Sequence, residues 1–434
     1  MDGILIGVIG FIVLVIIFLL RMPVGFAMAF VGVLGLSYLI SPEVALYVLA
    51  RDFFSIFSSY SLTVIPMFTL MGCIASESGM SRRLYDAGYV LFGKFPGGLA
   101  LATVLGCAGF AAINGSTSAT AAAMGKVCIP EMKRYKYDNS LSTGIVAAAG
   151  TLGIMIPPST IFIVYGILTE QSIGKLFISG VFPGLIIAAL LMVTVAILCW
   201  RNPKLAPAAA ASTFKEKMEA LTGIIEMLVL FFFVILGLFF GWFSPTQAGA
   251  AGVAGAILIG LITKQLKWQG FLNALKDTVR ITAMVMVIVA GATVFGHFIA
   301  ITRIPMVLSG WVGSLPLPPM GIMAVIIVIY LMGGCFMDSL AMITLTIPIF
   351  YPVVLALGVD PIWFGVIIVL VVEMGVITPP VGLNVYVIKG IAPDVPLETI
   401  FKGIFPFLAA LVVAAIILLL FPQIATFLPS LAKY

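Results

Sequence analysis

Two apolar runs of this chain are each interrupted by a Pro-Pro pair. Residues 153–159 read Gly-Ile-Met-Ile-Pro-Pro-Ser, and residues 375–380 read Gly-Val-Ile-Thr-Pro-Pro. Proline has no N–H and its ring clashes with the carbonyl four residues earlier, so Gly153, Gly375 and the residue after each lose their helical partners. Free carbonyls at the negative end of a half-helix suit a dehydrated Na⁺, which prefers hard oxygen ligands. The half-helices that resume after the prolines begin with free N–H groups, which suit a carboxylate.

Two other apolar stretches, 98–130 and 320–357, carry small polar residues at their middle. The first centre, residues 114–120, reads Asn-Gly-Ser-Thr-Ser-Ala-Thr and is rich in hydroxyls. The second centre, residues 333–339, reads Gly-Gly-Cys-Phe-Met-Asp-Ser and carries a carboxylate. We expect these oxygens to complete the sites that the prolines open. The alternative interpretation is that Ser and Thr bond back within their helices and that the prolines are tolerated kinks.

Few charged residues lie in or beside these runs, and each is a candidate for function. Asp338 stands at the second polar centre and serves either an ion or ligand site or a structural partner. Glu373 lies just before the second proline break and either orients backbone amides or pairs with a lysine. Arg303 follows the run 281–300 and either clamps a carboxylate or lies at a membrane interface. His297, the only histidine, has no carboxylate or cysteine at metal spacing and is expected to be a packed polar residue.

The elements that carry these residues must lie in a membrane. Of 434 residues, 62% are hydrophobic and only 9% are charged, and the mean hydropathy is +1.25. A soluble protein has about 25% charged residues, so this composition excludes a soluble enzyme, a nucleic-acid binder, a disordered chain and a disulfide scaffold. The five cysteines form no CxxC pair and are expected to be small core residues.

Ten apolar runs are long enough to cross a bilayer, which takes roughly 20 apolar residues. These runs are 3–20, 23–40, 55–76, 141–169, 183–200, 224–241, 245–262, 281–300, 361–388 and 405–421. We interpret 98–130 and 320–357 as hairpins that enter and leave on one side. With the N-terminus outside, 17 Lys and Arg then fall inside and four outside, as the positive-inside rule requires. Arg51 and Asp52 are expected at an interface.

Five prolines of the first half match prolines 222 residues later, where a random alignment would give about one match. The pairs are Pro23/Pro245, Pro96/Pro318, Pro130/Pro352, Pro157/Pro379 and Pro158/Pro380. The sequence therefore predicts an all-α polytopic membrane protein of two repeats, 1–200 and 223–434, joined by a cytoplasmic linker, 201–222. Each repeat holds five crossings, one re-entrant helical hairpin and one Pro-Pro-broken helix. Because five is odd, the two repeats must be inverted.

Inverted repeats with broken helices near mid-membrane are typical of alternating-access secondary transporters. An intramembrane enzyme is the main alternative class, but Asp338 lacks the Gly-x-Gly-Asp context and the second helix Asp of an aspartyl dyad. Nothing around Ser116 resembles a Gly-x-Ser-Gly nucleophile turn, either. A channel would not need two opposed broken sites, and the chain has no P-loop that would indicate a primary pump.

The chain resembles the large membrane subunit of tripartite ATP-independent periplasmic (TRAP) transporters from about residue 21 to residue 406. The most specific matches are residues 114–120, residues 150–159 (Gly-Thr-Leu-Gly-Ile-Met-Ile-Pro-Pro-Ser) and residues 373–384 (Glu-Met-Gly-Val-Ile-Thr-Pro-Pro-Val-Gly-Leu-Asn). The resemblance implies coupling to Na⁺, with two or more ions. It also implies an elevator mechanism, in which the hairpins and broken helices slide against a scaffold of the outer helices of each half.

Residue matching to the family also implies three sets of site residues. The first Na⁺ site would use Asn114, Ser116, Gly150, Gly153 and Ile156. The second Na⁺ site would use Gly334, Asp338, Gly375 and Thr378. The substrate would contact Arg303, Asp338, Ser159 and Asn384.

The resemblance further implies two protein partners, a small four-helix membrane subunit and a periplasmic substrate-binding protein that delivers an organic acid. It places the chain in the bacterial inner membrane as a multi-pass protein. Overall likeness favours a sialic acid over a C4-dicarboxylate. The absence of a fused small-subunit segment before residue 1 predicts a separate small subunit. The alternative is a stand-alone divalent-anion/Na⁺ symporter, in which Ser-Asn-Thr tips recur in both halves, whereas the second tip here carries Asp338.

Overall fold

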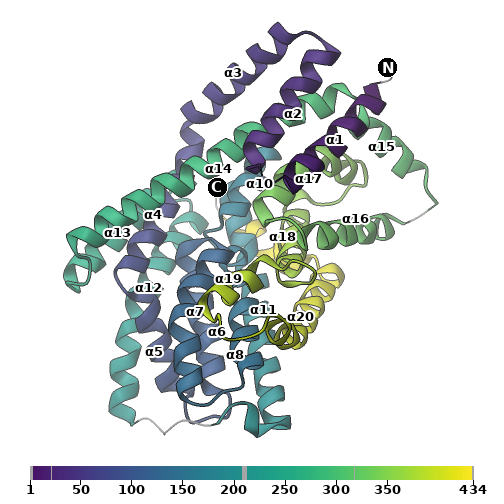
Figure 1. Ribbon diagram of the computed structural model, residues 1–434. Coiled ribbons are helices and arrows are strands. Elements are labelled where there is room, and N and C mark those ends of the chain that lie inside the picture. The colour runs from purple at the N-terminus through teal and green to yellow at the C-terminus, as the bar shows by residue number, and fades with distance from the viewer. Residues whose placement is uncertain (1–2, 21, 208–212, 317, 433–434) are drawn as a thin grey trace.

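The computed structural model describes residues 3–20, 22–207, 213–316 and 318–432. Every regular element within these ranges is a helix (Figure 1), which confirms the predicted all-α class. Arg21 and Lys433, which the topology prediction counted, lie outside the described residues, as do residues 208–212 of the predicted linker.

The first half of the chain contains both predicted interruptions, one hairpin and one broken helix. Its helices are α1 (Gly3–Leu19), α2 (Val24–Leu39), α3 (Pro42–Ser58), η1 (Tyr60–Thr63), α4 (Val64–Glu77), α5 (Met80–Phe92), α6 (Gly98–Asn114), α7 (Thr117–Arg134), α8 (Asn139–Ala149), α9 (Leu152–Met155), α10 (Thr160–Leu168), α11 (Ile173–Arg201) and η2 (Pro203–Leu205). Local signals set several of these ends. Ser41 caps α3 by accepting a hydrogen bond from the Val44 N–H, and Pro42 occupies the first turn.

The second half repeats the pattern of a hairpin followed by a broken helix. Its helices are α12 (Phe214–Phe239), α13 (Pro245–Ile262), α14 (Trp268–Ile301), α15 (Ile304–Ser314), α16 (Pro319–Gly334), α17 (Ser339–Ala356), α18 (Pro361–Ile377), α19 (Leu383–Ile391), α20 (Leu397–Leu420) and α21 (Gln423–Leu431). Ser244 and Gln247 form a reciprocal capping box that starts α13. Asp360 caps α18 by accepting from the Trp363 N–H at 2.9 Å.

Several helices lie where the sequence predicted loops or extend beyond the predicted spans. The expected crossing 55–76 is divided between the end of α3, η1 and α4, and the expected inner loop around residues 82–94 is mostly helix α5. α11 and α14 begin 10 and 13 residues before the predicted spans 183–200 and 281–300, and α15 and α21 were not expected. The physical reason is common to all of them. A search for apolar runs of about 20 residues misses helices that are short or carry a polar face.

The predicted linker segment 201–222 contains helical structure at both of its ends. η2 lies at its start, and α12 begins at Phe214, within the predicted linker. Residues 214–222 read Phe-Lys-Glu-Lys-Met-Glu-Ala-Leu-Thr, and Lys, Glu, Met, Ala and Leu are all good helix formers. Their charge marked the segment as polar, but their helix propensity extends the following helix into it.

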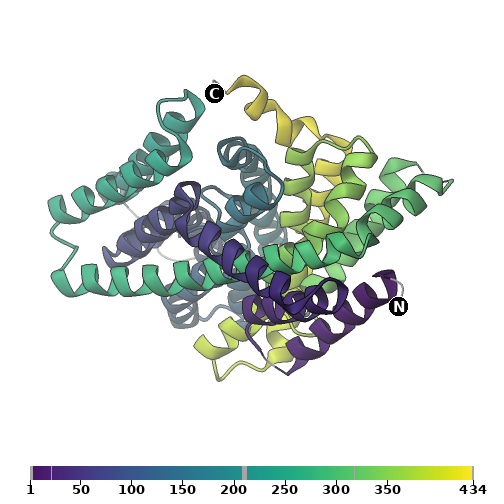
Figure 2. The same ribbon diagram turned by 90° about the horizontal axis from the view of Figure 1, so that it is seen from above.

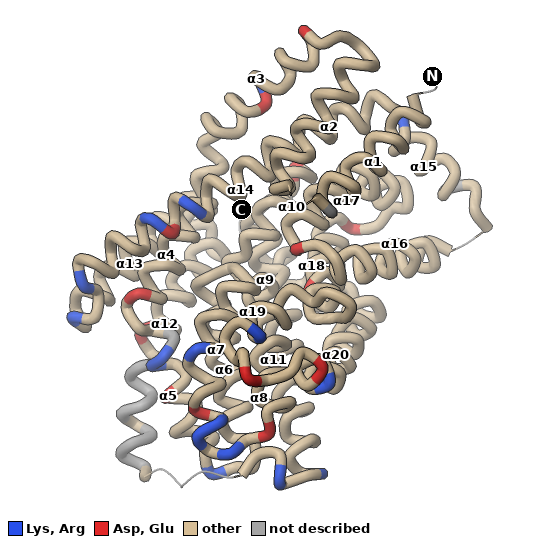
Figure 3. The backbone as a smooth tube through the Cα atoms, viewed as in Figure 1, with Lys and Arg blue, Asp and Glu red and all other residues tan. Residues whose placement is uncertain are grey.

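Within the described residues, six helices are long and apolar enough to cross a membrane by length and composition. They are Tyr60–Glu77, Ile173–Arg201, Pro245–Ile262, Trp268–Ile301, Ser339–Ala356 and Leu397–Leu420. A seventh span is the pair Asn139–Met155 and Thr160–Leu168, which is bent by 43° at its break. Figure 3 shows most Lys and Arg at the lower and left side of the molecule and few at the upper right. This asymmetry agrees with the positive-inside distribution.

The long helix α14 crosses the whole width of the molecule, as the view from above shows (Figure 2). It packs against α2, α3 and α4, and its contact with α2 depends on two glycines. A methyl group on Gly291 would lie 2.0 Å from the carbonyl oxygen of Gly25, so only glycine allows the two backbones to approach this closely. A separate apolar core, which includes Met28, Val31 and Phe298, fills the space around this contact.

His297 of α14 does have a carboxylate partner, contrary to the expectation of a merely packed residue. Its Nε2 lies 3.2 Å from Oδ2 of Asp52 on α3 and 3.3 Å from the Arg51 guanidinium. Asp52 is buried, whereas the sequence placed it at an interface. The residues are 245 positions or more apart in the chain, so spacing along the sequence could not reveal the contact between α3 and α14.

Candidate functional site

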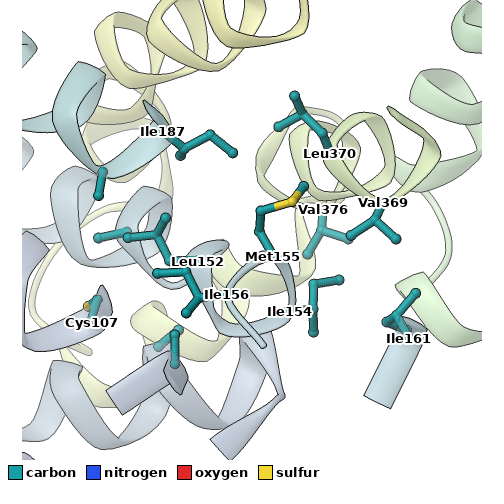
Figure 4. Close-up of a cluster of buried hydrophobic side chains, with 14 of the residues drawn as sticks. Cys107, Leu152, Ile154, Met155, Ile156, Ile161, Ile187, Val369, Leu370 and Val376 are labelled. Carbon is teal, nitrogen blue, oxygen red and sulfur yellow. The ribbon is translucent and has the colours of Figure 1, made fainter. Parts of the chain in front are cut away.

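Both Pro-Pro pairs interrupt their helices as predicted. α9 ends at Met155 and α10 begins at Thr160, and α18 ends at Ile377 and α19 begins at Leu383. Both Pro-Pro peptide bonds are cis. Figure 4 shows apolar side chains from the two broken helices, among them Met155 and Val376, gathered around the first break. These side chains exclude water from the polar backbone of the break.

Both hairpins form, and their tips carry the predicted polar residues. Figure 1 shows hairpin α6–α7 in the lower part of the molecule and hairpin α16–α17 at its right side. Ser116 caps α7 by accepting from the Ala119 N–H, and Asp338 caps α17 by accepting from the Leu340 and Ala341 N–H groups at 3.0 and 3.1 Å. The caps use one lone pair of the Ser116 hydroxyl and Oδ1 of Asp338, and they leave the Ser116 hydrogen and Oδ2 of Asp338 available to a ligand.

The first tip lies directly against the first break. A methyl group on Gly153 would lie 2.5 Å from the Ser116 carbonyl oxygen and 2.7 Å from Oγ1 of Thr120. Thr120 is fully buried, and its hydroxyl has no hydrogen-bond partner. A buried hydroxyl without a partner is costly, so this oxygen is a strong candidate for ion binding.

Thr120 is the residue that the implied first Na⁺ site omitted, although it belongs to the hydroxyl-rich tip that indicated the site. The Gly150 carbonyl already accepts the Gly153 N–H at 2.9 Å, and the Ile156 N–H bonds to Leu152. The side chain of Asn114 donates to the Ser116 carbonyl at 3.4 Å and so steadies the tip. The structure therefore brings Ser116, Gly153 and Thr120 together where the first Na⁺ site was expected.

The second tip lies against the second break through two glycines. A methyl group on Gly375 would lie 2.6 Å from the α-carbon of Gly334, so α16 and α18 touch backbone to backbone. Thr378 uses its hydroxyl within its own helix, donating to the Met374 carbonyl at 2.6 Å, and its N–H bonds to the Gly375 carbonyl at 2.8 Å. Gly334 and Gly375 are thus brought together, whereas the Thr378 hydroxyl follows the alternative, back-bonded interpretation.

Glu373 connects the two hairpin tips, a role that the sequence did not indicate. The carboxylate is buried on α18 with 1% of its surface exposed. Its Oε2 accepts the hydroxyl of Thr117, the first residue of α7, and its Oε1 accepts the hydroxyl of Ser339, the first residue of α17, both at 2.6 Å. The predicted partners, backbone amides or a lysine, are replaced by these two hydroxyls. One side chain therefore holds the tips of both hairpins.

A cavity of about 250 Å³ opens between the two tips. Its polar lining comes from both hairpins, at Gly115–Ser118 and Asp338–Ser339, and from Thr160. The apolar lining comes mainly from α14, at Ile281, Met284, Val285 and Ile288, and from residues beside the breaks, Ile154, Ile161, Leu340, Val376 and Leu383. Asp338 is the only ionisable residue among the described lining residues.

Three residues implied to contact the substrate do not line this cavity. Arg303 lies exposed between α14 and α15, with a left-handed φ of 61°. Ser159 is buried and caps α10 by accepting from the Phe162 N–H, and buried Asn384 donates to the Ala147 carbonyl at 3.3 Å. The start of α10 is closed rather than open to a carboxylate, because the Thr160 N–H and hydroxyl both donate to the Gly115 carbonyl.

The family model for the DctM component of tripartite ATP-independent periplasmic transporters matches residues 11–424. The chain belongs to this family. A C4-dicarboxylate TRAP transporter large permease protein of Pseudomonas aeruginosa is 38% identical over 403 residues, which cover 92% of this chain and 93% of the relative. A sialic acid TRAP transporter large permease protein of Vibrio cholerae is 32% identical over 414 residues, which cover 94% and 95%.

Among solved structures, the crystal structure of the Alcanivorax borkumensis YdaH transporter matches with a TM-score of 0.62 at 17% identity. The match covers 88% of this chain and 89% of that one, and it supports the fold alone. Membership in the TRAP family confirms the predicted resemblance. The relatives are named as permeases, so the TRAP chain is a multi-pass membrane transporter component rather than an intramembrane enzyme.

Proposed function

We propose that the chain carries an organic acid across the bacterial inner membrane together with Na⁺. The observation that carries this proposal is the single cavity between two oxygen-rich hairpin tips, each packed against a broken helix. Sites of this kind, near the middle of the membrane and between discontinuous helices, hold substrates and coupling ions in secondary transporters.

The first Na⁺ would bind at Ser116, Gly153 and Thr120, with Gly150, Ile156 and Asn114 around them. The fit rests on the buried Thr120 hydroxyl that has no partner and on the carbonyl of Gly153, whose helical partner position is taken by proline. The second Na⁺ would bind where Gly334 and Gly375 touch, with Asp338 and Thr378 nearby. Each ion would supply the positive charge that an anionic substrate needs in a cavity whose described lining offers only a carboxylate.

An organic acid is the substrate class that agrees with the relatives, whose names specify a C4-dicarboxylate and a sialic acid. Sequence identity is higher to the C4-dicarboxylate permease, so identity does not favour the sialic acid that overall likeness suggested. The substrate would bind between the tips, at Asp338. Arg303, Ser159 and Asn384 lie outside the cavity in this conformation and would contact substrate only after a rearrangement.

The movement would be an elevator motion of the hairpins and broken helices against a scaffold. One wall of the cavity is α14, which packs with α2, α3 and α4, while the other walls are the tips and the breaks. The boundary between the scaffold and the moving body would then run through the cavity. The two halves would be inverted repeats, so that each body contains equivalent parts of both.

The chain would act with two partners. A periplasmic binding protein would deliver the acid, and a small four-helix membrane subunit would enlarge the scaffold. Both proposals rest on membership in a tripartite transporter family.

Uptake into proteoliposomes tests the proposed function. The chain is reconstituted with its small subunit, with and without the cognate binding protein, under an inward Na⁺ gradient or a matched K⁺ gradient. Labelled sialic acid and labelled C4-dicarboxylates are offered in turn. Accumulation of one acid that requires both Na⁺ and the binding protein is the expected result. Uptake that is as fast under the K⁺ gradient as under the Na⁺ gradient, or that does not depend on the binding protein, would contradict the proposal.

A further inference from the structure

The two hydroxyls that meet Glu373 also line the cavity. Thr117 and Ser339 each donate their only hydroxyl hydrogen to the buried carboxylate at 2.6 Å, and both belong to the cavity wall. Glu373 itself does not line the cavity. It therefore acts on a ligand only through the two hydroxyls that it holds.

A hydroxyl has one hydrogen to donate and two lone pairs that accept. Because Glu373 takes the hydrogens of Thr117 and Ser339, these groups present only acceptors to the cavity. The Thr160 hydroxyl is committed in the same way, to the Gly115 carbonyl at 3.0 Å. Asp338 is an acceptor as well, and its Oδ1 is already occupied by two backbone N–H groups.

Ser116 differs from Thr117, Ser339 and Thr160 because its hydroxyl hydrogen is still available to a ligand. Its oxygen accepts the Ala119 N–H, and no acceptor for its hydrogen is found among the described residues. Ser116 can therefore still donate to a carboxylate. The cavity thus combines two hydroxyls that can still donate, those of Ser116 and Ser118, with a group of acceptors between the tips.

We propose that Glu373 is a positioning residue that makes this cavity select acids bearing hydrogen-bond donors, such as hydroxyl or ammonium groups, over equally charged acids without them. The proposal rests on the proposed function and narrows its substrate class. A carboxylate placed against Thr117 and Ser339 would meet only lone pairs, whereas a hydroxyl placed there would donate to them. Unpaired polar groups in such a site are strongly disfavoured, so the difference becomes selectivity.

Binding to the purified chain in Na⁺ buffer tests the selectivity without requiring transport. Succinate, malate and tartrate share four carbons and two carboxylates and carry none, one and two hydroxyls. Ligand-dependent shifts of the thermal unfolding midpoint give the half-saturating concentration of each. We expect that concentration to fall about three- to tenfold with each added hydroxyl. Binding of tartrate that is no tighter than binding of succinate, including no shift with either acid, overturns the inference.

The role of Glu373 is tested by Glu373→Gln, since the amide NH₂ must donate to one of the two hydroxyls. That hydroxyl regains a hydrogen to give to the ligand, so the preference for tartrate over succinate should narrow to about threefold or less. Glu398→Gln is the matched control, because Glu398 is exposed in the first turn of α20 and should leave the preference unchanged. If Glu373 had only a structural role, Glu373→Gln would weaken the binding of all three acids equally. That result would overturn the assignment.

Thr117→Val and Ser339→Ala keep the test valid if Glu373→Gln does not fold. Each substitution removes one acceptor from the cavity. It should weaken the binding of tartrate about three- to tenfold and leave the binding of succinate unchanged. The two proposals fail separately. Selective binding without Na⁺-driven uptake would contradict only the proposed function, and uptake without selectivity would contradict only this inference.

Discussion

At the scale of single residues, the polar groups around the cavity divide into those that hold the fold and those left for a ligand. Ser116 and Asp338 cap helices, and Thr378 bonds back within α18, so each serves the structure as well as any site. Thr120 is the exception, because its buried hydroxyl has no partner. The free hydroxyl of Thr120 is therefore a specific indication of an ion ligand beside the first break.

Replacing Thr120 by Val should test this interpretation with little change of shape. We expect the Na⁺ concentration for half-maximal uptake to rise about tenfold, since the ion loses one of its oxygen ligands. Removing a buried hydroxyl without a partner should leave the thermal stability equal or higher. Thr143→Val is the control, because Thr143 is equally buried but donates to the Asn139 carbonyl within α8. A normal Na⁺ dependence in Thr120→Val would remove Thr120 from the site.

Asp338→Asn separates the charge of the second tip from its cap. Asparagine caps helices about as well as aspartate, so the unfolding temperature should change little, but uptake should fall at least about tenfold. Asp360→Asn makes the same change at the start of α18, away from the cavity, and should transport normally. Full uptake by Asp338→Asn would show that only the cap matters at this tip.

The sequence located many of these residues because their types are informative in their local context. Small hydroxyl residues at a hairpin tip and glycines before Pro-Pro pairs indicated Ser116, Gly153 and Gly375, whereas Gly334 was implied by the resemblance to the family. It could not reveal the Thr117 partner of Glu373, because Thr117 is 256 residues away and meets Glu373 only where the first hairpin tip reaches α18 in the fold. Long-range contacts of this kind leave no periodic signal.

At the scale of elements, the two breaks and the two hairpins were predictable because they depend on local chemistry. Proline removes a donor wherever it stands, and a polar tip cannot lie in the middle of an apolar helix without a turn. Helices α3, α5, α15 and α21 were not predicted, because none of them is both long and apolar. The division of 55–76 into α3, η1 and α4 has no proline or glycine to mark it between Ser58 and Val64.

Replacing Pro157 and Pro158 together by Ala should test what the first break contributes. Restored N–H groups allow α9 and α10 to join, and the carbonyls of Gly153 and Ile154 then regain helical partners. We expect the Na⁺ affinity for uptake to become at least about tenfold weaker. The matched control is Pro183→Ala, which replaces a proline in the interior of α11 and should leave the Na⁺ affinity unchanged. Unaltered Na⁺ affinity in the double variant would contradict the use of backbone ligands.

Contacts between the halves also hold the elements in place outside the membrane-spanning segments. Lys133 at the end of α7 donates to both carboxylate oxygens of Asp394, before α20, at 2.7 Å. The hydrogen bonds from Lys133 hold the pKa of Asp394 below its usual value. Asp394 is therefore protonated, and the ion pair lost, as the pH falls through the lowered pKa.

At the scale of the whole molecule, the proposed elevator motion requires the hairpin tips to move against α14. Val285 of α14 and Leu340 beside the second tip face the same cavity, so cysteines at these positions should be joined by a short thiol-reactive cross-linker. A background without the five free cysteines is needed. We expect cross-linking to stop uptake and its reversal to restore it. A control cysteine pair at Lys133 and Asp394, which contact each other away from the cavity, should transport normally after cross-linking. Normal uptake by the Val285–Leu340 pair would contradict movement at this boundary.

The central claim is that Na⁺ and an organic acid cross together through one site. Its most direct test is the simultaneous entry of labelled acid and radioactive sodium into proteoliposomes that contain the chain with its small subunit and binding protein. The account predicts that acid drives sodium entry in a fixed ratio, and that Thr120→Val lowers both fluxes in parallel at limiting Na⁺. Acid uptake without accompanying sodium, or sodium entry that is independent of the acid, would contradict it.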